Sequence, residues 1–447
     1  MNKELSSKFQ LNFLIKLSVP AVLSQMAQMG MGFIDTIMAG RHSKDTLAVV
    51  SVGSNLFIPV IIFVLGVFLS INPLTSGYSA RGETHNLAKI FKSALFLALM
   101  ISIPIFFIVR NLEPIIHLLG LNSSMSKSAD DYLEAISYGV LPLFLFLAIR
   151  FFNEGLFSTR AIMFITLSAL PFNILFNYLF LFKMDMGPAG LGYATSIAYA
   201  YLFLAMLFFT LKYKGYQQFQ KQISNVKIDF EEIKKIIRLG IPIGIGLTLE
   251  VTMFAITGLF IALFGIATIA GHQIAMNISS MTFMMPMGIS IATTARVGYY
   301  YGKGDYKTAT KIGYMGTGLS LIIMCISALC MWTIPEILVG FYTDDPNTMK
   351  IAVSLLFYAA IFQLFDGIQV TVLGALRGFH DTKVPMYLNL IAYWILGFPM
   401  GYLLSKRFQA SGFWMGFILA LTTAAILMSL RYRWMSRHFK KRDDSNC

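Results

Sequence analysis

Long apolar stretches alternate with short polar segments along almost the whole chain. Most of them exceed the roughly 20 residues that an α-helix needs to cross the hydrocarbon core of a bilayer. The pattern predicts twelve membrane-spanning helices at 13–39, 46–76, 89–110, 130–152, 161–182, 190–212, 236–264, 267–298, 310–334, 347–374, 384–405 and 411–433. The expected fold class is therefore an all-α integral membrane protein.

One polar interruption is longer than the others and divides the spans into two sets of six. Residues 213–235 carry five lysines and read as a cytoplasmic linker. We therefore predict an N-terminal lobe at 1–212, the linker at 213–235, and a C-terminal lobe at 236–447 that ends in a basic cytoplasmic tail.

The two halves resemble each other in sequence at three places. The matching pairs are 17–20 with 239–242, 77–88 with 298–309, and 190–192 with 412–414, and the offset is the same in all three to within one position. Because each half holds an even number of spans, both copies should face the same way across the membrane. Such a parallel repeat predicts two six-helix lobes related by an axis along the membrane normal, with a substrate cavity between them.

Composition and charge support the membrane assignment and set its orientation. The chain is 56% hydrophobic and 13% charged, with a mean hydropathy of +0.68, so most of its apolar surface must face lipid. The net charge of +13 could suggest a nucleic-acid partner. However, an N-terminus inside the cell places 27 of the 35 Lys and Arg residues on the cytoplasmic side. This positive-inside distribution predicts that both termini are cytoplasmic, and it argues against nucleic-acid binding.

Three carboxylates lie within predicted spans: Asp35, Glu250 and Asp366. An ionisable side chain at membrane depth costs about 2.5 to 3.5 kcal/mol on insertion scales, so such residues usually face the bundle interior and mark ion or substrate pathways. The repeat does not duplicate them, because their counterparts are Thr257, Gln28 and about Leu147. The pattern indicates a transporter whose two lobes differ in chemistry.

Glu250 and Asp366 belong to different spans of the C-terminal lobe, both near the middle of the membrane. Two carboxylates in a poorly solvated pocket cannot both stay ionised without a counter-charge, so they must bind a cation, hold a proton, or alternate between these states. Carboxylate oxygens suit a hard metal cation such as Na+, with amide or backbone oxygens completing the shell. The alternative is a permanently protonated pair with a purely structural role.

Two further polar sets are candidate site residues. Asn173 and Asn177 are four residues apart and share one helical face, where they could form with Asp35 a cluster that binds a proton or substrate. The alternative is a structural cluster of helix–helix contacts. Gln273 and Asn277 are also four apart, and they could contact the ion or the substrate, or only join helices.

These residues lie in segments that resemble the multidrug and toxic compound extrusion (MATE) family, and within it the NorM-type branch. The resemblance spans almost the whole chain and is carried by segments 33–40, 171–173 with Asn177, Glu250, 271–277, 365–367 and 374–378. It implies efflux of amphipathic, often cationic, compounds in exchange for a cation, by alternating access. It also implies a bacterial inner-membrane protein, with Na+ as the coupling ion in members that share Glu250 and Asp366. Phe362 departs from the pattern, because a tyrosine hydroxyl would be expected one turn before Asp366.

Two other function classes remain to be compared with the transporter. A flippase for a lipid-linked saccharide would share the two-lobe layout, but its cavity should be lined with Arg and Lys to hold pyrophosphate. Here Lys16, Arg150, Arg296 and Arg377 are placed near the cytoplasmic boundary. A membrane enzyme would need a nucleophile–base or metal set, and the sequence contains none. We expect no enzyme activity, no cofactor other than the coupling ion (Na+, or H+ as the alternative), and a monomer.

Overall fold

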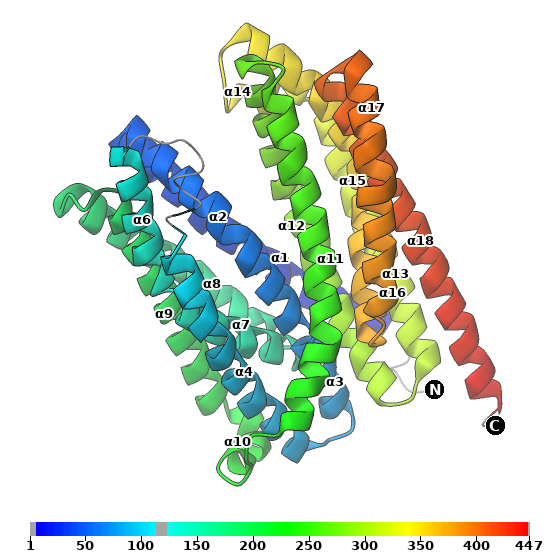
Figure 1. Cartoon of the computed structure of the whole chain (residues 1–447). Helices are drawn as coiled ribbons and strands as arrows, with labels where there is room; N and C mark the ends of the chain where they lie inside the picture. Colours follow the sequence, from blue (N-terminus) through cyan, green and yellow to red (C-terminus); the bar gives the residue numbers. More distant parts are fainter. Residues whose placement is uncertain (1–5, 113, 115–122, 446–447) are drawn as a thin grey trace. The chain divides into compact units, whose positions relative to one another are not determined.

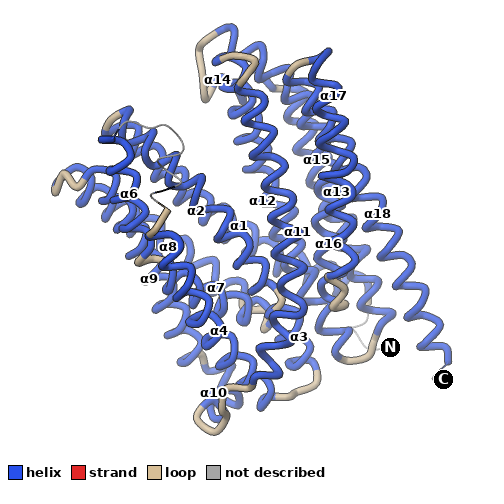
Figure 2. Tube along the Cα trace, in the orientation of Figure 1, coloured by secondary structure: helices blue, strands red, loops and turns tan. Residues whose placement is uncertain are grey.

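The protein is almost entirely helical in the computed structural model, which describes residues 6–112, 114 and 123–445. Figure 2 shows helices joined by short loops, and no strand is drawn for the described residues. In the first half the elements are α1 (Ser7–His42), α2 (Lys44–Leu69), α3 (Ile71–Ala80), α4 (Thr84–Arg110), α6 (Ser123–Ser137), α7 (Val140–Gly155), α8 (Thr159–Asn177), the π-helical η2 (Tyr178–Lys183) and α9 (Gly187–Lys212).

The second half of the chain is coloured from green through yellow to red in Figure 1. Its elements are η3 (Lys214–Tyr216), α10 (Gln217–Ile223), α11 (Phe230–Ala262), α12 (Ile266–Gly302), α13 (Tyr306–Thr333), α14 (Pro335–Gly340), α15 (Pro346–Gly378), α16 (Lys383–Asn389), the π-helical η4 (Leu390–Gly397), α17 (Phe398–Phe408) and α18 (Ala410–Ser445).

The membrane spans agree with the sequence prediction. Within the described residues, eleven helical segments are long and apolar enough to cross a membrane, and the number is twelve if one bent pair forms a single span. That pair is α6 and α7, which meet at an angle of 43° where the predicted span 130–152 lies. The bend falls at Gly139, where a Cβ atom would come within 2.8 Å of Ser196 Oγ on α9. The all-α membrane fold is confirmed.

The chain forms two compact units. The N-terminal unit comprises Leu23–Gly244, and the C-terminal unit comprises Ile245–Cys447 together with Met1–Val22. The division therefore falls inside α1 and α11, whereas the predicted lobes were divided at the linker 213–235. Hydropathy alone does not reveal this arrangement, because it marks a helix as lipid-spanning without indicating which helices it packs against.

Contacts within each unit explain why the division falls there. In the C-terminal unit, the Nε2 of Gln10 on α1 donates to the Tyr300 hydroxyl on α12 at 2.6 Å. In the N-terminal unit, the Tyr78 hydroxyl at the end of α3 donates to Glu232 on α11 at 2.8 Å. A Cβ added to Gly240 would lie 2.3 Å from the Val67 carbonyl oxygen, so only glycine allows this close approach of α11 to α2. The first part of α1 thus belongs to the C-terminal unit and its second part to the N-terminal unit. In α11 the order is reversed.

The linker packs against the N-terminal unit. Phe219 of α10 lies against Phe91 of α4, with ring centroids 5.4 Å apart. Asp229 forms an ion pair with Lys89 at 2.9 Å, and its backbone N–H donates to the Ser93 hydroxyl at 3.0 Å. The hydrogen bond from Lys89 holds the pKa of the Asp229 carboxyl below its ordinary value. The linker is therefore a docked segment of this unit.

The repeat is visible in the turns that end equivalent helices, and it corrects one predicted alignment. The N–H groups of Gly82 and Gly304 each donate to the carbonyl three residues earlier, at 3.1 Å. Both glycines have positive φ angles, 69° and 78°, a conformation that favours glycine. Gly82 and Gly304 are as far apart in the sequence as positions 17 and 239, which the first matching pair aligned. With this offset the segment 77–88 pairs with a segment that begins at 299, whereas the sequence alignment predicted a start at 298.

A second pair of turns fixes the register between α7 and α15. Phe157 and His380 have φ angles of 63° and 62°. The N–H of Phe157 donates to the carbonyl of Glu154 at 3.0 Å, and that of His380 donates to the carbonyl of Arg377 at 2.9 Å. Glu154 is therefore the counterpart of Arg377. In this register the counterpart of Asp366 is Leu143, and the predicted position near Leu147 was wrong by one helical turn.

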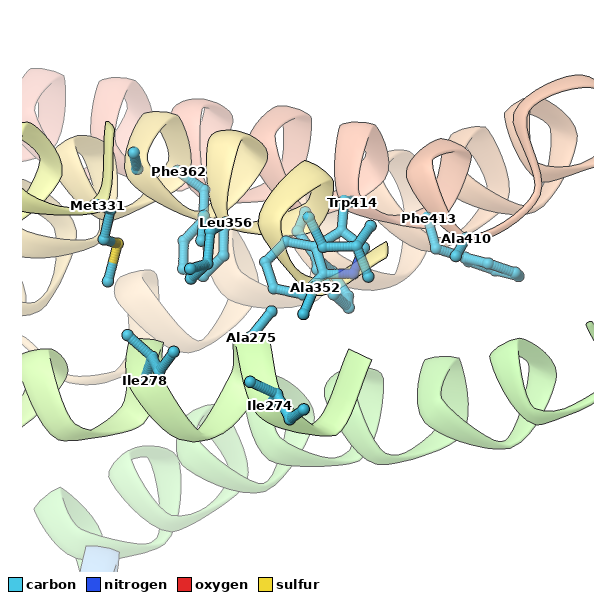
Figure 3. Close-up of a cluster of buried hydrophobic side chains, with 14 of the residues drawn as sticks. Ile274, Ala275, Ile278, Met331, Ala352, Leu356, Phe362, Ala410, Phe413 and Trp414 are labelled. Atoms are coloured by element: carbon cyan, nitrogen blue, oxygen red, sulfur yellow. The ribbon is translucent and has the colours of Figure 1, made fainter. Parts of the chain in front are cut away.

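The core of the C-terminal unit supports the polar residues described below. Figure 3 shows Ile274, Ala275 and Ile278 of α12 beside Ala352 and Leu356 of α15, with Trp414 of α18 close by. Phe362 packs against Trp414, with ring centroids 5.6 Å apart. Trp414 in turn donates from its indole nitrogen to Nδ1 of His272 at 3.2 Å. This bond gives His272 the internal partner that a buried histidine requires.

Candidate functional site

Glu250 and Asp366 lie together inside the C-terminal unit. Glu250 comes from α11 and is half-buried, while Asp366 comes from α15 and is 6% exposed. Their charges interact directly. They share a cavity of about 160 Å³, whose other lining residues are Val251, Phe254, Met276, Ser279, Ser280, Phe283 and Phe362. The structure thus brings the two predicted carboxylates to one cavity that is mostly apolar but has two hydroxyls.

Polar groups that the sequence did not indicate surround this pair. Gln369 and Tyr393 face Glu250, and Arg377 acts on Glu250 through its charge. Arg377 lies eleven residues after Asp366, which places the two on the same face of α15 three turns apart. Tyr393 lies in the π-helical segment η4, a type of helical irregularity that is frequent at functional sites.

Two buried oxygen atoms of this group, Asp366 Oδ1 and the side-chain oxygen of Gln369, have no hydrogen-bond partner among the described residues. Both residues are almost fully buried. An orphaned polar atom in a buried site costs free energy and calls for an explanation such as a bound ion or water. The residues fit a monovalent cation, because carboxylate, amide and phenol oxygens are hard ligands.

The charges of this group do not balance. The group contains two carboxylates, Glu250 and Asp366, and one guanidinium, that of Arg377, which interacts by charge with Glu250. With all three ionised the net charge is −1, and an unbalanced charge in a poorly solvated site is costly. One monovalent cation or one proton would neutralise the group. We call these five residues, Glu250, Asp366, Gln369, Arg377 and Tyr393, the C-terminal centre.

Tyr393 supplies a hydroxyl to this site, whereas the family pattern would place a tyrosine at Phe362. Phe362 lines the cavity beside Asp366 but supplies only a ring edge or face. The Tyr393 phenol faces Glu250 from η4 instead. A hydroxyl is therefore present at this site, although it comes from a different helix from the one on which the sequence pattern would place it.

Asp35, Asn173 and Asn177 also meet, in the N-terminal unit. The side-chain nitrogens of Asn177 and Asn173 donate to Asp35 Oδ1 at 2.6 and 3.1 Å. Thr195 of α9, which sequence reasoning missed, donates from its hydroxyl to Asp35 Oδ2 at 2.9 Å. Three donors around one carboxylate stabilise its ionised form, and protonation of Asp35 would remove an acceptor from this set.

Gln273 and Asn277 have a different environment from the one predicted for ion ligands. Both side chains are exposed on α12. The residues of the same helix that line the cavity beside Glu250 are Met276, Ser279 and Ser280. A contribution of Gln273 or Asn277 to transport therefore stays a prediction, and their exposure suits contact with a substrate better than membership of a buried ion shell.

Three arginines are buried within the protein. Arg150, Arg296 and Arg377, which the sequence predicts near the cytoplasmic boundary, are only 2%, 6% and 3% exposed. Arg150 pairs with Glu154 at 2.8 Å. The spacing of four residues between Arg150 and Glu154 was the one available signal, because oppositely charged residues four apart share a helical face.

Comparison with known proteins identifies the family. A family model described as MatE matches residues 20–179 and again residues 242–403. The starts of the two matched segments are separated by the offset of the sequence repeat, so one model matches each half of the chain. This double match confirms the internal repeat.

Solved structures of similar fold cover nearly the whole chain. A D35N mutant of the Vibrio cholerae MATE transporter VcmN matches with 15% identity and a TM-score of 0.89, over 98% of this chain and 99% of that one. A MOP superfamily transporter from Pyrococcus furiosus matches with 15% identity and a TM-score of 0.89, over 96% and 97%. The eukaryotic MATE transporter AtDTX14 matches with 16% identity and a TM-score of 0.88, over 97% and 98%.

These likenesses agree with the resemblance found in the sequence and with the two-lobe helical layout. The chain therefore belongs to the MatE family of multi-pass membrane transporters, which are not enzymes.

Proposed function

We propose that this protein is a secondary multidrug efflux transporter of the NorM-type branch. It exports amphipathic, often cationic, compounds by alternating access, in exchange for Na+ that enters at the C-terminal centre. H+ is the alternative coupling ion. The observation that carries the proposal is the charge of that centre, which contains two carboxylates and a single guanidinium.

The coupling follows from this charge. With the cation bound, the centre is neutral and tolerates burial; without it, the net charge of −1 favours a hydrated state. A conformational equilibrium that changes the hydration of the centre is therefore biased by the ion. Any effect of the ion on substrate affinity is matched by an equal effect of substrate on ion affinity, because linkage is reciprocal.

Na+ is favoured over H+ by the ligand set. Glu250, Asp366, Gln369 and Tyr393 offer oxygens of three chemical types, and the buried oxygens Asp366 Oδ1 and Gln369 Oε1 have no hydrogen-bond partner among the described residues. A proton would occupy only one carboxylate oxygen and would leave the amide oxygen of Gln369 without a partner. A metal cation would satisfy several of these oxygens at once.

The N-terminal unit contributes the second part of the proposed mechanism. The Asp35 cluster with Asn173 and Asn177 binds a proton or the cationic group of a substrate, because the carboxylate is half-buried and accepts three hydrogen bonds. Gln273 and Asn277 are the proposed contacts for the substrate from α12, where their amides are exposed.

The membrane setting is also part of the proposal. The distribution of basic residues puts both termini in the cytoplasm, and the branch implies the inner membrane of a bacterium. We propose a monomer, because each unit contains its own charged centre.

The flippase alternative loses support from the surroundings of the buried arginines. Arg150 is engaged by Glu154 and Gln28, and Arg296 donates to Gln10 and Tyr300. Arginines that serve a pyrophosphate would need free donors to form bidentate contacts with it.

Dye efflux from proteoliposomes tests the proposal, with Na+ and H+ gradients imposed separately. An inward Na+ gradient at equal pH should drive export in the wild-type protein and fail to do so in Glu250→Gln. Cys325→Ser is the matched control, because Cys325 is exposed on α13 and belongs to neither polar site. If only a pH gradient drives export, the centre stands and the ion is H+. If neither gradient drives export, the proposed function is wrong.

A further inference from the structure

The N-terminal unit contains a buried polar group that the proposed function does not use. Arg150 on α7 donates from Nε to Glu154 Oε1 at 2.8 Å. Its Nη1 donates to the Gln28 side-chain oxygen on α1 at 2.7 Å, and its Nη2 donates to Gln25 on the same helix. The guanidinium thus contacts three side-chain oxygens from two helices, and one of them belongs to a carboxylate. We call Arg150, Glu154, Gln25 and Gln28 the N-terminal centre.

Further buried oxygens adjoin this centre. Glu154 is 2% exposed. Asn72 of α3 is fully buried, and its side chain interacts with the Glu154 carboxylate. The adjacent Gly155 explains the proximity of the two helices, because a Cβ there would lie 2.6 Å from the Asn72 carbonyl oxygen.

The repeat shows that the two centres occupy related positions. Gln28 and Glu250 are equivalent, because their separation equals that between the starts of the two family-model matches, at positions 20 and 242. The helix-terminal turns at Phe157 and His380 make Glu154 the counterpart of Arg377. By the same register, the counterpart of Arg150 is Leu373, an aliphatic residue. The N-terminal unit therefore has a guanidinium at a position of α7 whose equivalent on α15, Leu373, carries no charge.

The charges of the two centres differ accordingly. In the N-terminal centre one guanidinium faces one carboxylate, and the charges cancel. The C-terminal centre contains two carboxylates and one guanidinium, and one negative charge remains. The counterpart of Glu250 is Gln28, whose oxygen accepts a hydrogen bond from the Arg150 guanidinium. In the N-terminal unit the guanidinium of Arg150 thus contacts Gln28, and Gln28 is the residue equivalent to Glu250, the proposed ligand of the cation.

We propose that Arg150 is the built-in cation of the N-terminal unit, and that its guanidinium fills an oxygen-lined cation site whose counterpart in the C-terminal unit is open to an exchangeable ion. The comparison between the units rests on the proposed function, but the site itself does not. Without Arg150, the oxygens of Glu154, Gln25 and Gln28 form a vacant cation site. A small planar cation of the same chemistry, free guanidinium, should bind there.

Chemical rescue tests this proposal on the purified full-length protein. The Arg150→Ala variant should melt on the order of 5 °C below the wild type, because a buried carboxylate loses its partner. Low-millimolar guanidinium chloride, far below denaturing concentrations, should restore about half of this loss or more, with saturation. Tetramethylammonium, which has no N–H donors, should restore none of it at equal concentration and ionic strength.

Two controls separate a cation site from a general effect of the salt. Guanidinium should not raise the melting temperature of the wild type, where the site is filled. It should also not raise that of Arg150→Ala/Glu154→Gln, which has no carboxylate to neutralise. Equal stabilisation of all three proteins, or no saturable stabilisation of Arg150→Ala, would overturn the proposal and leave Arg150 and Glu154 as an ordinary structural ion pair.

A second comparison applies if Arg150→Ala does not fold. Arg150→Lys keeps the positive charge, and Arg150→Met has similar length without it, so Arg150→Lys should melt well above Arg150→Met. Equal melting temperatures would contradict a role as a cation. These readouts do not involve Glu250 or transport. Failure of rescue would therefore leave the proposed function intact, and failure of Na+-driven export in the wild type would leave this result intact.

Discussion

The C-terminal and N-terminal units bury related polar centres that differ in charge. The former joins Glu250 on α11 to Asp366 and Arg377 on α15, and the latter joins Gln28 on α1 to Arg150 and Glu154 on α7. One centre lacks one positive charge and the other is already balanced. A duplicated scaffold can thus carry an exchangeable ion in one copy and a covalently attached cation in the other.

The Asp35 cluster adds a second difference between the units. Asp35 accepts hydrogen bonds from Asn173, Asn177 and Thr195. Its counterpart in the repeat is Thr257, which is fully buried and whose hydroxyl has no partner among the described residues. Each unit therefore has one carboxylate site that the other lacks. This asymmetry allows substrate and ion to act on different units.

The largest expected effect follows from removing a charge of the C-terminal centre. Glu250→Gln and Asp366→Asn should each reduce gradient-driven dye efflux by more than about tenfold, because the loss of the negative charge removes the requirement for a bound cation. Rates in proteoliposomes with matched amounts of protein measure this effect. Wild-type efflux rates in both variants would contradict the proposed difference between the units, because the C-terminal centre would then have no role in ion coupling.

Asp35→Asn should impair efflux to a smaller extent and leave membrane insertion unchanged. The amide keeps the shape of the carboxylate, but it cannot carry the charge that the three donors stabilise. Dye resistance of expressing cells, normalised to the amount of protein in the membrane, measures the effect. Full resistance at equal expression would reduce the Asp35 cluster to a structural role and leave only the C-terminal centre as a functional site.

Tyr393→Phe sharpens the description of the C-terminal centre. Removing the hydroxyl should weaken the apparent Na+ affinity of transport by about fivefold, which corresponds to one hydrogen-bond-sized contribution of about 1 kcal/mol. Phe362→Tyr is the informative companion, because it adds a hydroxyl beside Asp366 on α15. An unchanged Na+ dependence in Tyr393→Phe would remove the phenol from the ligand set.

The smallest effect concerns the docked linker. Asp229→Asn should lower stability by less than about 1 kcal/mol at neutral pH, because the ion pair with Lys89 is partly exposed and screened by solvent. The pKa of Asp229 is lowered in the folded protein. The contribution is therefore present above the ordinary pKa of an aspartate, and it is lost as pH falls through the lower, folded pKa. Melting temperatures of variant and wild type should converge in acid; a constant difference would point to a cause other than the ion pair.

The sequence predicted those features that lipid makes costly to change. Spans are visible because backbone polar groups must be satisfied within long apolar helices, and Asp35, Glu250 and Asp366 stand out because charge is rare in such helices. Thr195, Gln369 and Tyr393 did not stand out, because hydroxyls and amides are common in spans and only tertiary contacts select the functional ones. Arg150 and Arg377 resembled interfacial arginines, which extend toward the membrane surface.

The packing partners of α1 and α11 were equally hidden from the sequence. Hydropathy showed two continuous helices, whereas each helix is divided between the two units. The glycine contact of Gly240 with Val67 and the hydrogen bond of Gln10 with Tyr300 determine this division. Both join residues that lie far apart along the chain, which no local pattern connects.

Direct measurement of Na+ binding tests the central claim, that the Na+ site is confined to the C-terminal unit. Equilibrium binding of radioactive sodium to the purified protein should give about one ion per chain, as the single uncompensated charge requires. Asp35→Asn and Arg150→Lys should retain this binding, and Glu250→Gln/Asp366→Asn should lose it. Sodium binding that persists in the double variant and disappears in Asp35→Asn would contradict the account.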